Sequence, residues 1–215
     1  MAAILESLRK PSITNQPPSA AEQRRNDLLV IAVILFAIFL GWGVRTNTAG
    51  ATRSFALGGQ LPTLAYPAAW LEAQTDGVLF RAIDPASPST FDARVEFFVR
   101  DLKEGETLDQ ISVSWPLRRG QEYDRFRNLS ATVTKGAGGA PALLITYAYI
   151  AGPTRESGSL GLPVVVKGQD LLFVANDGIG DRLVAVTVAA DASEWAAYAD
   201  DFSAIFASLG IQGGE

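Results

Sequence analysis

Residues 194–210, EWAAYADDFSAIFASLG, decide the fold class. Large apolar side chains recur there every three or four residues, which predicts an amphipathic helix with one apolar stripe. The stripe consists of Trp195, Tyr198, Phe202, Ile205, Phe206 and Leu209. Asp191 and Glu194 resemble a capping box at the start of this helix, and Gly210 occupies the position of a C′ glycine. Burying the stripe requires a sheet face of similar width, so we expect a sheet to precede the helix.

The segments before this helix have the pattern of strands separated by turns. Seven of them are alternating or continuously apolar: 77–82, 93–100, 129–135, 142–150, 163–167, 171–175 and 182–189. Gly168, Gln169 and Asp170 are expected to form a turn between two of these strands. The sequence therefore predicts an α+β domain over residues 60–210, with a twisted, mostly antiparallel sheet and helices packed on it.

A short helix is also predicted in the middle of this domain. Thr107 and Gln110 have the spacing of a capping box, which satisfies the first backbone donors of a helix. Pro116 is expected to stop the helix after Ser114, because proline removes a backbone donor and clashes with the preceding turn.

Residues 28–44, LLVIAVILFAIFLGWGV, contain no charge and no proline. A helix of this length covers about 25 Å, slightly less than a hydrocarbon core of about 30 Å. A buried core helix would show a polar face, which this segment lacks. A cleaved signal peptide is a second alternative, since residues 49–51, AGA, fit the cleavage rule, but 27 residues precede the apolar run. The pattern favours a permanent transmembrane anchor.

The flanking cations predict the orientation of this anchor. Four precede the apolar run and two follow it: Arg9, Lys10, Arg24 and Arg25, then Arg45 and Arg53. The positive-inside rule therefore places the N-terminus in the cytoplasm and the later residues outside the inner cell membrane. The predicted organisation is a cytoplasmic tail (1–27), a transmembrane helix (28–44), a linker (45–59), a periplasmic, lumenal or extracellular domain (60–210) and a C-terminal tail (211–215).

The composition excludes several kinds of chemistry. The chain has no cysteine and no histidine, and its one methionine is Met1. Disulfides, thiolate metal sites, histidine-ligated haem and histidine-activated nucleophiles are therefore excluded. A net charge of −5 argues against a nucleic-acid partner. Because no suitably placed carboxylate pair is readable either, we expect no enzymatic activity, no catalytic residue and no bound cofactor or metal.

One stretch of the predicted outer domain is basic. Residues 118–127, RRGQEYDRFR, contain four arginines, whereas residues 45–215 have 14 basic and 20 acidic side chains. Two interpretations remain open: a solvated loop, or a surface for lipid headgroups or an acidic partner. The candidate contact residues here are Arg118, Arg119, Arg125 and Arg127.

The tail and the anchor supply the other candidate contact residues. They are Ile4, Leu5 and Leu8, which share a helical face, and Gly41, Trp42 and Gly43 near the end of the apolar run. Glycines allow a neighbouring helix to approach closely, and an indole favours the membrane interface. We therefore expect the anchor and tail, rather than a pocket in the outer domain, to carry the main partner contacts.

Short motifs of the outer domain resemble the PsbP-type domain. They are Tyr66-Pro67-x-x-Trp70, Gly77-Val78, Asp84-Pro85, Trp195-x-x-Tyr198 and the following Phe202-x-x-Ile205-Phe206-x-Ser208-Leu209. The resemblance covers about residues 60–210 and implies an α/β/α sandwich around an antiparallel sheet. It also implies an accessory role, since PsbP-type proteins act mainly as extrinsic subunits of photosynthetic membrane complexes or as related binding modules. The chain departs from the soluble members in having its own apolar segment, and its lack of histidine puts any metal role in doubt.

Together these features predict a non-catalytic, single-pass accessory subunit of a multisubunit membrane complex. The resemblance to the PsbP-type family implies that this complex is an electron-transfer complex, respiratory or photosynthetic. Its partners would be other membrane-protein subunits and the lipid bilayer. The alternative is a stand-alone membrane-tethered binding module for a small ligand or an envelope lipid, which a deep apolar pocket in the outer domain would favour.

Overall fold

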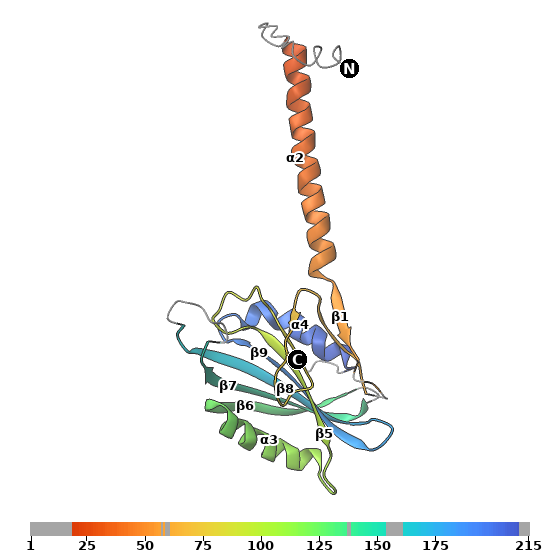
Figure 1. The fold of residues 1–215 in the computed structure, drawn as a ribbon, viewed down its shortest axis with the longest axis vertical. Helices are drawn as coiled ribbons and strands as arrows, with labels where there is room; N and C mark the ends of the chain where they lie inside the picture. Colours follow the sequence, from red (N-terminus) through yellow and green to blue (C-terminus); the bar gives the residue numbers. More distant parts are fainter. Residues whose placement is uncertain (1–18, 57, 59–60, 137–138, 154–160, 211–215) are drawn as a thin grey trace, which may run out of the picture. The chain divides into compact units, whose positions relative to one another are not determined.

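The structure is a computed structural model that describes residues 19–56, 58, 61–136, 139–153 and 161–210. The chain divides into two compact units, one ending at Asn47 and the other beginning at Thr48. Element labels are those of Figure 1.

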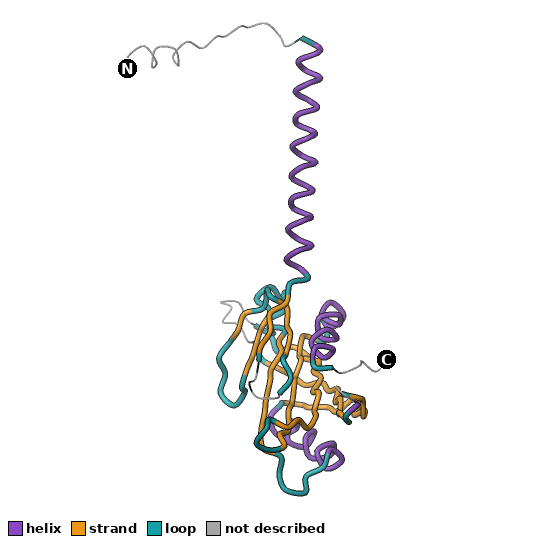
Figure 2. The backbone as a smooth tube through the Cα atoms, turned by 90° about the vertical axis from the view of Figure 1, so that its right-hand side faces the viewer, coloured by secondary structure: helices purple, strands orange, loops and turns teal. Residues whose placement is uncertain are grey.

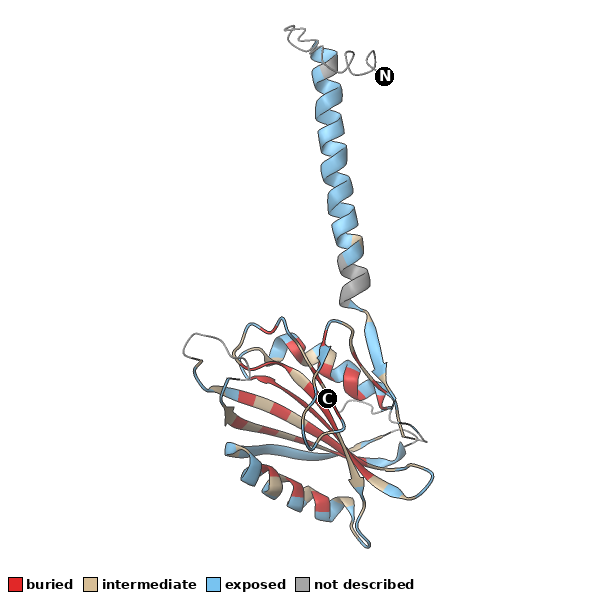
Figure 3. Cartoon of the chain, viewed as in Figure 1, coloured by how far each residue is buried: buried red, intermediate tan, exposed pale blue. Residues whose placement is uncertain are grey.

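Apart from Ser19, the described part of the first unit belongs to helix α2, Ala20–Ala49. This helix contains the predicted segment 28–44 and begins within the residues predicted as a tail. Its portion Gln23–Val44 has a mean hydropathy of 2.5 and is long and apolar enough to cross a membrane, as an anchor or a signal sequence would. Its large apolar side chains are exposed, so α2 is pale blue along this portion in Figure 3.

The second unit is built on a seven-stranded antiparallel sheet of order β3-β4-β5-β9-β8-β7-β6. Its strands are β3 Leu71–Glu72, β4 Phe80–Ile83, β5 Arg94–Asp101, β6 Asp124–Lys135, β7 Pro141–Ala151, β8 Val164–Asn176 and β9 Asp181–Asp191. A separate two-stranded sheet pairs β1, Thr52–Phe55, with β2, Leu64–Pro67. The predicted α+β class with an antiparallel sheet is confirmed.

Helices cover both faces of the large sheet, as Figures 1 and 2 show: α3, Leu108–Glu122, lies on one face and α4, Trp195–Ser208, on the other. The central strand β9 is buried on both sides. Its Val184 and Val186 belong to the apolar cluster under α4, and Leu183 and Ala185 belong to the cluster under α3. Because successive side chains of a strand point to opposite faces, one strand serves two cores. This layering is the one that the PsbP-type resemblance implies.

The stripe of α4 packs on the sheet as its spacing predicts. Its buried members are Tyr198, Phe202, Ile205, Phe206 and Leu209, whereas Trp195 is only partly buried. Gly210 follows the helix with φ +75°, as expected of a C′ glycine. The predicted capping box is wrong, because Glu194 makes no side-chain cap bond. The Oδ1 of Asp191 instead accepts a hydrogen bond from the Ser193 amide at 2.9 Å.

The capping box of α3 is present, but the predicted end of this helix is wrong. Thr107 and Gln110 cap its start reciprocally, and the helix continues through Pro116 to Glu122. The helix continues because of two residues that lie one turn apart, on either side of the proline. Trp115 and Arg119 both bond to the same buried carboxylate, so tertiary contacts outweigh the hydrogen bond that proline removes.

The predicted turn at Gly168, Gln169 and Asp170 is also wrong, because these residues lie inside the continuous strand β8. Gly168 is required there for close packing. A Cβ atom at this position would lie 2.6 Å from the Tyr147 ring on β7. Glycine therefore lets two buried strands approach, a role that sequence alone does not distinguish from a turn.

Three element boundaries also differ from the predicted ones. Strand β1 lies within the predicted linker 45–59 and pairs with β2. Strand β4 begins at Phe80, because Gly77 has φ +81° and forms part of a turn. Strand β6 begins at Asp124, five residues before the predicted start.

Candidate functional site

A buried carboxylate, Asp170 of β8, lies on the α3 face of the sheet. Its Oδ2 accepts hydrogen bonds from Trp115 Nε1 at 2.6 Å and from Arg119 Nε at 2.8 Å. Its Oδ1 accepts hydrogen bonds from Arg119 Nη2 at 3.1 Å, Tyr147 Oη at 2.9 Å and Thr187 Oγ1 at 2.7 Å. The two carboxylate oxygens thus receive five hydrogen bonds, which fasten α3 to the sheet.

The electrostatics of this Asp170 network are those of a structural ion pair. Burial acts to lower the pKa of Arg119, but the Asp170 charge more than offsets it, and the net shift is upward. Burial, reinforced by Asp170, raises the pKa of Tyr147 well above its usual value of 10. Because the carboxylate is fully buried and saturated with donors, it has no free position at which to accept a proton from a substrate.

A second ionic group, centred on Glu96 of β5, lies on the same face. Arg81 Nη2 and Arg94 Nε approach Glu96 Oε1 at 2.6 and 3.0 Å. Arg94 Nη2 also donates to Tyr149 Oη at 3.2 Å, and the Tyr149 ring stacks on Tyr123 with centroids 4.1 Å apart. Burial raises the pKa of both tyrosines, so both keep their protons at neutral pH.

An open cavity of about 240 Å³ lies next to these two groups, beneath the loop 76–78. Arg118 of α3 lines it, with its guanidinium carbon 4.3 Å from the Trp115 ring centroid and its Nε 3.0 Å from Glu122 Oε1. Glu96, Arg119 and Thr187 contribute to the lining as well. The arginines and Glu96 already have ionic partners, so their charges mainly neutralise one another.

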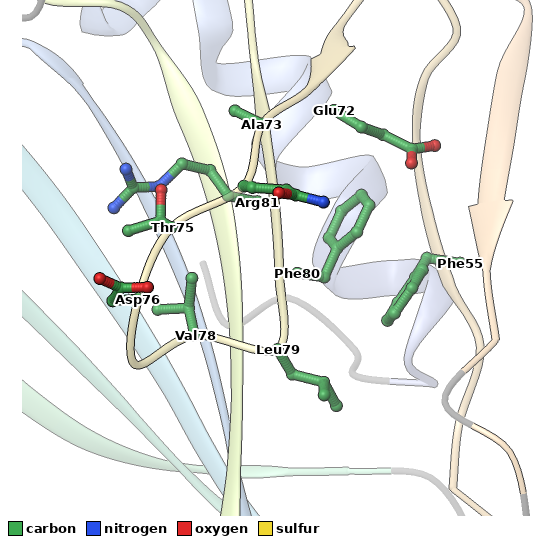
Figure 4. Close-up of a pocket in the computed structure, with 10 residues that line it drawn as sticks. Phe55, Glu72, Ala73, Thr75, Asp76, Val78, Leu79, Phe80 and Arg81 are labelled. Carbon is green, nitrogen blue, oxygen red and sulfur yellow. The ribbon is translucent and has the colours of Figure 1, made fainter.

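The largest cavity described here, about 550 Å³, lies beside β4 and opens to solvent (Figure 4). The Phe55 and Phe80 rings stack there with centroids 4.3 Å apart. Figure 4 shows the Arg81 guanidinium pointing away from these rings, in keeping with its ion pair to Glu96. The loop 73–79 supplies most of the remaining lining, and Gln74, Thr75 and Asp76 are its polar members. The cavity is therefore a polar depression with a small aromatic wall.

One carboxylate of this cavity is already engaged. Tyr66 Oη donates a hydrogen bond of 2.6 Å to Glu72 Oε1. Burial and this bond to Glu72 raise the pKa of Tyr66 to about 12. The pair joins β2 to the short edge strand β3 and stabilises the wall of the cavity.

The basic stretch is not a loop, so that interpretation is wrong. Arg118 and Arg119 belong to α3, and Arg125 and Arg127 belong to β6. Arg119 is buried in the Asp170 network and is therefore absent from the exposed basic surface. The contact roles of the other three arginines stay predictions.

The remaining candidate contact residues belong to the first unit. Gly41, Trp42 and Gly43 lie on α2, where Trp42 is exposed. Ile4, Leu5 and Leu8 lie outside the described residues. Their contact roles stay predictions.

Searches against protein-family models and against curated proteins find no match. Three solved structures are similar at low identity. LpqN of Mycobacterium tuberculosis, involved in cell envelope biogenesis, is 13 % identical, with a TM-score of 0.47 over 76 % of this chain and 91 % of that one. PA94 of Pseudomonas aeruginosa, of unknown function, is 14 % identical, with a TM-score of 0.40 over 77 % and 99 %. The Ran-binding protein Mog1p of Saccharomyces cerevisiae is 10 % identical, with a TM-score of 0.41 over 70 % and 82 %. These similarities assign no activity, and membership in the PsbP-type family stays a prediction.

A partial signal for the Asp170 network is present in the sequence, although the predictions missed it. Ile111, Trp115 and Arg119 follow one another at helical spacing and form the buried stripe of α3. An arginine in such a stripe indicates a buried acidic partner. Nothing local identifies that partner, since Asp170 is 51 residues away and follows a glycine that resembles a turn.

Proposed function

We propose that this chain is a non-catalytic, membrane-tethered accessory subunit of a multisubunit membrane complex. One observation carries the proposal: within the 22-residue portion Gln23–Val44 of α2, residues 28–44 contain no charged side chain and are apolar on all sides. Its large apolar side chains are exposed by 51 to 66 %. Such a surface is stable in a bilayer or against other apolar helices, because in water each of these side chains costs free energy.

The features of the outer domain support docking rather than catalysis. Its buried ionic groups, Glu96 and Asp170, are bound to arginines that fix the positions of α3 and the strands. Tethering also raises the effective concentration of the domain near its partners, so that weak individual contacts suffice. The PsbP-type resemblance extends the proposal to a respiratory or photosynthetic electron-transfer complex. The cation bias extends it to a cytoplasmic N-terminus and an outer domain in the periplasm or outside the cell.

The alternative, a stand-alone binding module, receives less support. The cavities described above open to the surface and are lined in part by charged side chains. A module for a lipid or an apolar ligand would instead use a more enclosed, mostly apolar pocket with few polar groups. We therefore treat the alternative as one outcome of the test.

The test compares three chains expressed in membranes: the full chain, a chain without residues 1–23, and a chain whose residues 28–44 are replaced by an alternating Leu-Ala segment of equal length. We expect all three to insert, and protease added to spheroplasts to digest only the outer domain. Partner subunits should co-purify with the full chain and be depleted in both variants. Equal co-purification with the free domain 48–210 would contradict the main role of the anchor and tail. Insertion without any reproducible partner would favour the binding module.

A further inference from the structure

The edge strand β6 has an open side. It pairs with β7 along one side, and no described strand pairs with the other. Ten of its twelve residues are exposed, which makes β6 pale blue in Figure 3 beside neighbours with buried stripes. A strand edge of this kind presents backbone donors and acceptors to any extended segment that approaches it.

Only part of β6 is regular enough to accept another strand. Its pairing with β7 is shifted between Asp124 and Arg127 and again between Asn128 and Ser130. From Ser130 onward the pairing is regular, and residues 130–133, SATV, are uncharged, exposed and free of proline. Bulges protect an edge from pairing, so the open part begins where the bulges end.

A mostly apolar pocket lies directly beside this regular segment. Its volume is about 330 Å³, and its apolar lining includes Leu108 of α3, Ala131 and Val133 of β6, and Leu143 of β7. The polar part of the lining comes from the start of α3 and consists of Thr107, Asp109 and Ser112. Val133 is 69 % exposed, although its paired neighbour Leu143 is buried under α3. Strand addition combines backbone hydrogen bonds with pockets for alternate side chains, and β6 offers both.

The charges at the two ends of this segment define its partner. Arg125 and Arg127 precede it and Lys135 follows it, all three exposed. None of the ion pairs within the described ranges includes any of them, whereas six other arginines of the outer domain are ion-paired. Carboxylates at the ends of an added strand would pair with these cations. Antiparallel pairing of two copies of β6 would instead bring cations close to cations.

We propose that residues 130–133 of β6 bind an extended acidic segment of a partner protein as an additional strand of the sheet. An apolar side chain of that segment enters the pocket formed by Leu108, Val133 and Leu143. Acidic side chains at one end of that segment pair with Arg125 and Arg127, and acidic side chains at its other end pair with Lys135. The inference rests on the proposed function, because it gives the outer domain of a docking subunit its own contact.

The test uses the full chain in detergent and a fluorescein-labelled peptide, EEVTVTVEE, as the probe. Two control peptides are KKVTVTVKK, with reversed charges, and EEVTPTVEE, in which proline interrupts strand pairing. We expect binding of the first peptide only. Amide hydrogen exchange in residues 130–133 should slow in its presence, while exchange on the opposite edge strand β3 stays unchanged.

Matched variants of the chain separate the pocket from the charges. Replacing Arg125→Gln and Arg127→Gln together should weaken binding about fivefold, and Ala131→Phe, which fills the pocket, should weaken it further. Arg53→Gln, which removes an exposed cation of β1 in the separate two-stranded sheet, should leave binding unchanged. Equal binding of all three peptides, or protection at β3 instead, would overturn the proposal.

Self-association is measured on the same samples by light scattering. A dimer that Ala131→Phe dissociates would identify a second copy as the occupant and overturn the acidic partner. Failure of this inference can be told apart from failure of the proposed function, because the β6 variants change neither membrane insertion nor the contacts of α2. Conversely, loss of anchor-dependent co-purification would not alter binding of the peptide to the outer domain.

Discussion

The Arg119 guanidinium and the Asp170 carboxylate meet inside the outer domain through two hydrogen bonds, Nε to Oδ2 at 2.8 Å and Nη2 to Oδ1 at 3.1 Å. The pair joins α3 to β8, because Asp170 lies 51 residues further along the chain than Arg119. When one partner of a buried ion pair is removed, the other charge stays in the interior without a counter-charge, which strongly destabilises the fold. The position of α3 on the sheet therefore depends on each of them.

Removing one partner of this pair should strongly destabilise the domain. We expect Asp170→Asn to lower the free energy of unfolding by about 3–5 kcal/mol, because the Arg119 charge stays buried without its counter-charge. Urea unfolding of the full chain in detergent, followed by tryptophan fluorescence, measures the effect. Asp109→Asn, on the exposed first turn of the same helix, is the control and should change stability by less than about 0.5 kcal/mol. A loss below about 1 kcal/mol for Asp170→Asn would show that water or another group neutralises Arg119.

The elements that sequence predicted well are those whose signals are local. The stripe of α4, the Thr107–Gln110 capping box and the C′ position of Gly210 all follow from residues within a few turns of one another. The continuous apolar run of residues 142–150 likewise predicted β7, because such a run between turn signals is a property of one buried strand.

The elements that it predicted wrongly depend on distant residues. Pro116 stops an isolated helix, but here Trp115 and Arg119 are held by Asp170, which no local pattern links to them. Gly168 resembles a turn until the Tyr147 ring of the neighbouring strand is placed against it. The basic stretch 118–127 was likewise interpreted as one surface, because the burial of each arginine depends on residues far away in the sequence. The fold buries Arg119 and exposes Arg125.

The close approach at Gly168 gives a second prediction. Gly168→Ala places a Cβ atom 2.6 Å from two carbons of the buried Tyr147 ring, so the ring or the strand must shift. We expect a loss of about 1–3 kcal/mol in the free energy of unfolding, the usual range for overpacking. Gly152→Ala is the matched control, since nothing lies within 4 Å of its added Cβ. Equal stabilities of the two variants in thermal unfolding would mean that Tyr147 moves freely, contrary to its packing.

The raised pKa values of the buried tyrosines predict that the domain loses stability at alkaline pH. Tyr66 ionises near pH 10 in the unfolded chain but at about 12 in the folded domain, because of burial and its bond to Glu72. Between these values the unfolded state loses its proton first, so stability that is fully present below pH 10 falls as the pH rises toward 12. Burial raises the pKa of Tyr149 and Tyr198 in the same direction.

Urea unfolding at pH 8, 10 and 11 measures this fall. The Tyr66→Phe variant removes one of the titrating groups, so its stability should decline less steeply above pH 10 than that of the parent chain. A parallel decline in the two chains would show that Tyr66 does not contribute to the alkaline loss.

The apolar stripe of α4 gives the last prediction. Phe202 is buried and contacts three aromatic rings, with centroid distances of 6.3 Å to Trp70, 4.9 Å to Trp195 and 5.8 Å to Tyr198. Phe202→Ala leaves a cavity that these rings cannot close without leaving their own contacts, so we expect a loss of about 3–5 kcal/mol in the free energy of unfolding. Ser203→Ala, on the exposed side of the same helix, should change it by less than about 0.5 kcal/mol. A loss below about 1 kcal/mol for Phe202→Ala, measured by urea unfolding of the full chain, would mean that α4 does not hold its apolar stripe against the sheet.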